Sequence, residues 1–203
     1  LLLDFHHTVF DGGSARPFFE ELAALYDGVT LPPPGVQFAD YSTWLMDRDL
    51  TAEKEYWANE LGGKIPRLNI APDFARPIRQ SFRGARVLGR IDLETAEKIR
   101  SLCRASETTD YMVLLASFMA LIGRIARQED VVVGTPISVR THREVERTIG
   151  MLVNTLALRA EPKDEKTFLG FLEEVREKCL GAYENAGCPF DGLVTAAGAA
   201  RDL

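Results

Sequence analysis

The 203-residue chain is 46% hydrophobic and 27% charged, with a net charge of −6, which is typical of a globular protein with a sizeable core. The acidic balance, without any block of Lys or Arg, argues against a nucleic-acid-binding surface. Its three cysteines lack C-x-x-C spacing, which disfavours a disulfide framework or a zinc ribbon and favours a reducing, cytoplasmic setting.

A strand predicted over residues 1–5 opens the chain and leads into two adjacent histidines, His6 and His7. Imidazole is the side chain that most readily takes and returns a proton near neutral pH. Because neighbouring residues on a strand point to opposite faces, we expect His7 to face a cleft and His6 to face the scaffold. A strand also needs a paired neighbour, so the sequence predicts that this chain is the C-terminal part of something longer.

Other interpretations of the histidine pair are open at this point. Both rings could be structural, buried and hydrogen-bonded. A metal site is disfavoured because the only other histidine, His142, lies in a charged segment and is expected on the surface. The H-H-x-x-x-D-G spacing that ends at Asp11 and Gly12 favours the catalytic interpretation, since Asp11 can orient a ring or pair with a basic group.

A helix is predicted directly after this turn. Ser14 is its expected N-cap, Pro17 lies in its first turn, and Gly28 ends it. The helix N-terminus therefore lies behind Gly12 and Gly13, where backbone donors and the helix dipole favour developing negative charge.

Two further helical segments follow a stiff proline-rich connector at residues 32–35. The first has Asp40 as its expected N-cap and carries Trp44, which we expect to be a scaffold residue near the site. The second runs over residues 51–61, where core packing is the expected role of Trp57.

The middle of the chain combines a long connection with its most apolar helix. After a proline-marked stretch, residues 82–92 weakly predict a strand and residues 93–104 predict an amphipathic helix. Thr109 is the expected N-cap of a helix over residues 111–122, which is apolar nearly all round and is therefore predicted to be buried. That helix is too short to span a bilayer.

Two more strands are predicted in the second half. Residues 131–138 form a β-branched run, which predicts a strand covered on both faces. A charged loop from Arg140 to Arg147 is expected to be solvated. In the strand predicted over residues 149–159, Asn154 shares a buried face with leucines, so its amide is either satisfied within the core or lines a site.

The chain closes with helices. An apolar stripe at helical spacing predicts a helix over residues 168–183, and a last short helix is expected from residue 188. Strands therefore alternate with helices, which indicates an α/β layered fold.

Together, several segments of the sequence resemble the condensation domains of nonribosomal peptide synthetases, in the chloramphenicol-acetyltransferase-like superfamily. Their order and spacing cover nearly the whole chain. The matching segments are His6–Gly12, Phe38–Trp44, Tyr56–Trp57, Gln128–Val131 with Gly134–Pro136, Ile149–Gly150 with Val153–Thr155 and Arg159, and Pro189–Asp191.

The sequence departs from the family pattern in two places. Asn185–Gly187 stands where the family usually has His-Gln-Asp, so no role is carried onto those positions. Arg201–Asp202 resembles the beginning of the family's last motif, cut short. The family also has a substantial N-terminal half before the two histidines, in agreement with the expectation drawn from the first strand.

The resemblance implies a two-layer α/β sandwich of the chloramphenicol-acetyltransferase-like type. Residues 1–45 would be the C-terminal tail of an N-lobe that bears the histidine motif, and residues 46–203 would belong to the C-lobe. The active site would lie in a tunnel between the lobes. Ser138, Asn154 and Trp44 are the expected lining residues.

The implied reaction is attack of an acceptor amine on a donor acyl thioester, which forms an amide. His7 would contact the attacking amine and remove or hold its proton. Backbone amides of Gly12 and Gly13 would bind the oxyanion. Asp11 is expected to be structural, pairing with a basic group in the N-terminal half or shaping the turn, and His6 to be scaffold.

The resemblance also implies partners. Donor and acceptor peptidyl carrier proteins would present both substrates as phosphopantetheine thioesters, so no cofactor would bind the domain directly. An adenylation domain and the N-terminal lobe are further expected partners, whereas nucleic acid, membrane and metal are not.

Alternatives remain within and outside this activity. An epimerization domain shares the histidine pair, but residues 153–159 match the condensation type. A heterocyclization domain is disfavoured because its Asp-rich replacement of the motif is absent. A stand-alone acyltransferase and a catalytically silent docking domain also remain, although both motif histidines are intact.

Overall fold

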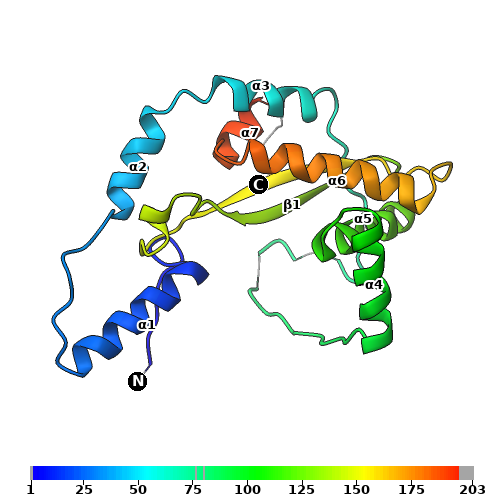
Figure 1. The fold of residues 1–203 in the computed structure, drawn as a ribbon. Coiled ribbons are helices and arrows are strands. Elements are labelled where there is room, and N and C mark those ends of the chain that lie inside the picture. The colour runs from blue at the N-terminus through cyan, green and yellow to red at the C-terminus, as the bar shows by residue number, and fades with distance from the viewer. Residues whose placement is uncertain (1, 76, 80, 197–203) are drawn as a thin grey trace. The chain divides into compact units, whose positions relative to one another are not determined.

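A computed structural model describes residues 2–75, 77–79 and 81–196 of the chain (Figure 1). Residue Leu1 and the Arg201–Asp202 step named above lie outside the described residues. The elements in chain order are α1 (Gly12–Tyr26), α2 (Phe38–Asp47), α3 (Thr51–Glu60), α4 (Leu93–Ala105), α5 (Asp110–Ala126), β1 (Val131–Ser138), the 3-10 helix η1 (Arg143–Val145), β2 (Val153–Ala160), α6 (Phe168–Glu184) and α7 (Phe190–Ala196).

The described chain divides into two compact units. Of the described residues, the first contains 2–62, 134–156 and 184–196, and the second contains 63–75, 77–79, 81–133 and 157–183. The chain passes from one unit to the other within each of the two strands. Every candidate site residue identified from the sequence belongs to the first unit.

The predicted helices are confirmed, with local corrections at their ends. The N-cap of α1 is Asp11 and not Ser14, which is the third helical residue and returns a hydrogen bond from its own hydroxyl. The residue before α2 is Gln37, and Asp40 instead accepts the Gln37 backbone N–H at 2.9 Å. Both errors have one cause, because a capping box pairs polar residues at both of its ends and the spacing alone does not say which residue comes first.

The strand predicted before the histidines is wrong. Residues 2–5 form no strand, because a strand needs a hydrogen-bonded neighbour and no other strand pairs with this segment in the described chain. Aromatic stacking holds the segment instead. The Phe5 ring lies 4.4 Å from the Phe10 ring in a stacked pair and meets Phe18 edge-on at 5.2 Å.

The strand predicted over residues 82–92 is also wrong. This segment has no regular structure, and both Val87 and Ile91 are exposed to solvent.

The two strands form a two-stranded sheet within the described residues. They run antiparallel, since the Val139 N–H bonds the Leu152 carbonyl at 3.0 Å at one end and Arg159 pairs with Asp130 at the other. The prediction that β1 is covered on both faces is wrong. Val131 and Thr135 are buried, whereas Gly134, Pro136 and Ser138 are exposed. The second strand begins at Val153 and not at residue 149.

The first unit has its core between α3 and α7, which pack against each other (Figure 1). Trp57 on α3 is fully buried, and its indole N–H donates to the Asn185 carbonyl at 3.0 Å. The prediction that Trp57 is a core residue is confirmed.

The second unit is built on α5, against which α4 packs. Thr109 caps α5, as predicted, by accepting the Met112 N–H. The expectation that α5 is buried all round is wrong, because one stripe of its apolar residues is exposed: Leu114, Phe118, Leu121 and Ile125.

Within the described residues, no single helix is long and apolar enough to cross a membrane, although α4 and α5 taken together, bent by 103°, reach that length and composition.

Candidate functional site

The two histidines lie on an exposed turn. Residues 7–9 form the turn, which the Val9 N–H closes by donating to the His6 carbonyl at 3.0 Å. His6 is held by its neighbour, since the Thr8 N–H donates to its Nδ1 at 3.1 Å and the Thr8 hydroxyl lies 2.7 Å from the same atom. No hydrogen bond to the His7 ring is found in the described part of the chain. The two rings therefore differ in the contacts that they make. They do not point to opposite faces of a strand, as the sequence predicted.

Asp11, in contrast, is buried and fully engaged. As N-cap of α1, its Oδ1 accepts the Ser14 N–H at 2.8 Å and lies 2.8 Å from the Ser14 hydroxyl. Arg140 binds the carboxylate in bidentate fashion, with Nη1 2.6 Å from Oδ2 and Nη2 2.7 Å from Oδ1. The Leu152 N–H also donates to Oδ2, at 3.0 Å.

The same contacts fix α1 to residues 148–152, which we call the strap. The Ser14 hydroxyl oxygen accepts the Gly150 N–H at 3.0 Å, and the Gly150 carbonyl lies 3.0 Å from that hydroxyl. Arg140 donates to the Thr148 carbonyl at 3.1 Å. One carboxylate, one hydroxyl and one guanidinium therefore link the beginning of α1 to Arg140 and the strap, which lie more than 120 residues later in the sequence.

This environment defines the charge state of Asp11. Burial alone would raise the pKa of the Asp11 carboxyl, but hydrogen bonds from Arg140, Ser14 and Leu152 outweigh burial and lower the pKa to about 2. The side chain of Arg140 is 9% exposed. Asp11 is thus an ionised anchor at neutral pH, as its predicted structural role requires.

Two sequence expectations are corrected here. The basic partner of Asp11 lies within this chain, and the segment that begins at Arg140 is not wholly solvated, because this guanidinium is buried against a carboxylate. The available signal in the sequence was Arg140 itself, a cation that follows the strand predicted over residues 131–138. Its guanidinium reaches the Asp11 carboxylate only through the tertiary fold.

The two glycines after Asp11 differ in their surroundings. A Cβ added at Gly13 would lie 2.5 Å from Nη1 of Arg140, so the guanidinium occupies the space that a side chain would need. A Cβ at Gly12 would meet nothing within 4 Å. Both residues lie in the first turn of α1, where backbone N–H groups have no intrahelical acceptor.

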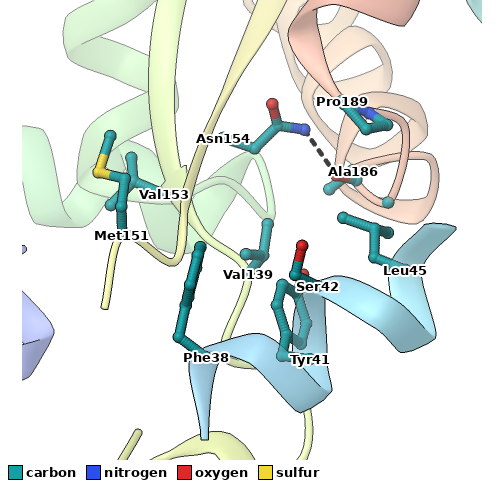
Figure 2. A pocket seen from close by; sticks show the side chains of 11 residues that line it. Phe38, Tyr41, Ser42, Leu45, Val139, Met151, Val153, Asn154, Ala186 and Pro189 are labelled. Carbon is teal, nitrogen blue, oxygen red and sulfur yellow. Dashed lines mark hydrogen bonds between the residues drawn. The ribbon is translucent and has the colours of Figure 1, made fainter. Parts of the chain in front are cut away.

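A pocket lies beside the strap (Figure 2). One face of α2 forms one side, and the opposite side comes from the end of the strap, the beginning of β2 and the loop before α7. Its volume is about 130 Å³. The lining residues are Phe38, Tyr41, Ser42, Leu45, Val139, Met151, Val153, Asn154, Ala186, Gly187 and Pro189.

Asn154 lines this pocket, but its amide is occupied by the backbone. Its Nδ2 donates to the carbonyls of Ala186 and Cys188 at 2.9 and 2.6 Å, and its Oδ1 accepts the N–H groups of Thr155 and Phe190 at 2.9 and 3.1 Å. Both alternatives drawn from the sequence therefore apply, since the amide is satisfied and the residue lines a pocket.

Trp44 and Ser138 lie outside the lining of this pocket. Trp44 is 42% exposed, meets the His142 ring edge-on at 5.7 Å, and lies under the Arg48 guanidinium at 5.1 Å. Ser138 is exposed and accepts the Arg140 N–H at 3.4 Å. The sequence reasoning missed Phe38, Tyr41 and Leu45, although their spacing places them on one helical face.

Metal-ligating groups do not gather anywhere in the described residues, where no cluster of three or more His, Cys, Asp or Glu side chains occurs.

Comparison with known proteins gives a consistent result. A family model described as "Condensation domain" matches residues 1–203. The chain is 41% identical over 198 residues to surfactin synthase subunit 1 of Bacillus subtilis (strain 168), covering 96% of this chain and 6% of that protein. It is 43% identical over 206 residues to tyrocidine synthase 3 of Brevibacillus parabrevis, covering 100% of this chain and 3% of that protein.

Solved structures share the fold. The complex of the X-domain and OxyB from teicoplanin biosynthesis matches with a TM-score of 0.89 at 24% identity, over 98% of this chain and 47% of that chain. The first condensation domain of the calcium-dependent antibiotic synthetase, with substrate analogue 3a, matches with a TM-score of 0.71 at 25% identity, over 97% and 45%. The chain thus spans a small fraction of the curated relatives and just under half of these solved chains.

Proposed function

The chain belongs to the condensation-domain family of nonribosomal peptide synthetases, and on that premise we propose that it forms the histidine-bearing part of a domain that makes amide bonds. A donor acyl or peptidyl thioester and an acceptor aminoacyl group would be the substrates. Peptidyl carrier proteins would present both on phosphopantetheine, next to an adenylation domain. The proposed lobe boundary lies near residue 45.

The chemistry of this reaction places modest demands on the protein. A thioester is already activated, and an α-amine with a pKa of about 7.7–8.0 is partly deprotonated at neutral pH. The domain has to align two tethered substrates and stabilise the charge of the tetrahedral intermediate. A strong base is therefore not required.

The single observation that carries the proposal is the placement of His7. Its ring is exposed on a turn whose far end is fixed by the buried Asp11–Arg140 pair. An imidazole in that position can approach an amine delivered from outside and take its proton during or after attack, or hold it in line. General-base help of this kind contributes typically about 10²- to 10⁴-fold.

The neighbouring residues take supporting roles in the proposal. The first-turn amides of Gly12 and Gly13 would donate to the oxyanion, with the positive end of the α1 dipole behind them. His6, whose Nδ1 is engaged by Thr8, would be scaffold. Asp11 would act only through the turn that it holds.

The test is a single-turnover condensation assay with the complete domain that contains this chain and with both carrier proteins loaded. His7→Ala is expected to lower the rate by about 10²- to 10⁴-fold without lowering the melting temperature. His142→Ala, which removes another exposed histidine, is the matched control and should leave the rate unchanged. Retained turnover in His7→Ala would remove His7 from the mechanism. Inversion of the acceptor α-carbon without amide formation would instead indicate epimerization.

A further inference from the structure

We infer that the pocket in Figure 2 is a subsite for a small apolar side chain, carried by one of the two groups that the domain joins. The inference rests on the proposed function for the identity of that carrier. The existence of the subsite rests on the pocket alone. Branched aliphatic side chains such as that of leucine are the chemical class that fits.

Size and lining support this occupant. The pocket measures about 130 Å³, and an apolar protein cavity of about 150 Å³ is known to take up benzene. Side chains from one face of α2 (Phe38, Tyr41, Leu45) line one side, with Phe38 toward Met151 and Val153 and Leu45 toward Ala186, as Figure 2 shows. A group of four to six carbon atoms is therefore of the right scale.

The walls are held in place by specific contacts. The Phe38 ring packs on the backbone of Gly150, where an added Cβ would lie 2.6 Å from the ring. Asn154 ties the loop before α7 through the Ala186 and Cys188 carbonyls and the Phe190 N–H. These contacts fix the walls from within the protein, so binding does not require the walls to reorganise.

Polarity of the lining excludes charged occupants. None of the lining residues is Asp, Glu, Lys, Arg or His. The Asn154 amide is fully used by the backbone, and burial raises the pKa of the Tyr41 hydroxyl against the opposing effect of the Arg48 charge. Arg48, whose charge acts on the Tyr41 hydroxyl, is already paired with Glu53 at 2.9 Å, so a charged side chain would lose its hydration there without gaining a free counter-charge.

The pocket is also connected to the histidine motif. Met151, which lines it, lies between Gly150 and Leu152, and these two residues bond Ser14 and Asp11. The strap that fixes the motif therefore also forms part of the wall of the pocket. An occupant that packs on Met151 is positioned by the same segment as His7.

The direct test uses the full chain with ¹³C-methyl methionine, followed by NMR. Of the four methionines, Met151 lines the pocket, Met46 is exposed on α2, and Met112 and Met119 are buried in the second unit. N-acetyl-leucine methylamide is expected to shift the Met151 methyl signal with saturation and leave the other three unchanged. Burial of four carbon atoms predicts a Kd on the order of millimolar. N-acetyl-glutamate methylamide should have no effect.

Two variants distinguish binding in the pocket from binding to the surrounding surface. Ser42→Phe fills the pocket from α2 and should weaken binding at least tenfold. Thr43→Phe introduces the same side chain at the next, exposed residue and should leave binding unchanged. The indole N–H signal of Trp57, which is buried in the same unit as the pocket, reports whether each variant is folded, and Ser42→Leu replaces Ser42→Phe if that variant is not.

The outcomes are decisive in both directions. An unmoved Met151 signal, equal response to the glutamate derivative, or undiminished binding to folded Ser42→Phe would overturn the subsite. Since the assay contains neither carrier protein nor thioester, its failure leaves the proposed condensation activity to its own test. The converse also holds, because inactive His7→Ala says nothing about this pocket.

Discussion

The two ends of the histidine motif lie in opposite environments. His6 and His7 are exposed on a turn, and within the described residues the hydrogen bonds to these rings come from Thr8 to Nδ1 of His6. Asp11 and Ser14, a few residues later, are buried and bonded to residues more than a hundred positions away. One short segment thus combines a presented end with an anchored end.

This difference assigns two tasks, positioning and reaction, to different ends of the motif. The anchored end determines where the turn lies, and the presented end provides the group that can react. Substitutions at the anchored end should therefore change the free energy of unfolding, and substitutions at the presented end should change only the rate. Stability measurements on matched variants test that separation.

The largest effect is expected for Arg140→Ala. It leaves the Asp11 carboxylate buried without its counter-charge, which should cost about 3–5 kcal/mol in the free energy of unfolding measured with denaturant. Arg147→Ala is the control, since Arg147 pairs with Glu20 and Glu21 at an exposed site, where such pairs contribute about 0–1 kcal/mol. An equal loss of unfolding free energy in the two variants would mean that the buried Asp11–Arg140 pair contributes no more than an exposed ion pair.

Acid should weaken the anchored end over a defined range. The pKa of Asp11 is lowered from 3.8 to about 2 in the folded protein, so the unfolded state binds the proton more tightly. The stabilisation, roughly 2 kcal/mol, is fully present above about pH 4 to 5 and is lost as the pH falls through about 2. Asp11→Asn lacks this titration, so its stability should depend less steeply on pH between 4 and 2. Parallel pH profiles would contradict the assignment.

A matched pair of glycine substitutions probes the contact with Arg140. Gly13→Ala forces the guanidinium out of position and should destabilise the protein by about 1–3 kcal/mol. Gly12→Ala meets no atom within 4 Å and should be neutral or stabilising by up to about 1 kcal/mol. Thermal unfolding of both variants checks the difference, and a loss in Gly12→Ala as large as in Gly13→Ala would point to helix geometry and not to Arg140.

The smallest effect is expected at the presented end. His7→Ala removes an exposed ring without a hydrogen bond in the described residues, so its free energy of unfolding should stay within about 0.5 kcal/mol of the parent. Denaturant unfolding under the conditions used for Arg140→Ala makes the values comparable. A loss above 1 kcal/mol would show that His7 is itself part of the anchor.

The elements that the sequence predicted well are those specified by local contacts. The N-cap of α5 at Thr109 and the limits of α3, α4 and α6 follow from caps and apolar spacing, which operate within a few residues. The alternation on β2 likewise follows from its leucines. The two false strands, over residues 1–5 and 82–92, have strand-like composition, but a strand also depends on a neighbour that composition does not reveal.

The site was predictable only in part, for a related reason. The motif indicated a structural role for Asp11, which its buried contacts match, whereas the role of His7 stays a prediction. Arg140 was missed because it lies 129 residues from Asp11 and reads locally as part of a charged loop. The pocket was missed because four separate segments build it, namely residues 38–45, residue 139, residues 151–154 and residues 186–189.

The distance between Asp11 and Arg140 also has a consequence for folding during synthesis. At about 5–20 residues per second, a ribosome needs roughly 6 to 26 seconds to add the 129 residues that separate them. During that interval the cap of α1 is complete, but its carboxylate has no guanidinium and its hydroxyl has no strap. Helix α1 should therefore form early and dock late, so that the histidine turn acquires its final position only after Arg140 and the strap have been made.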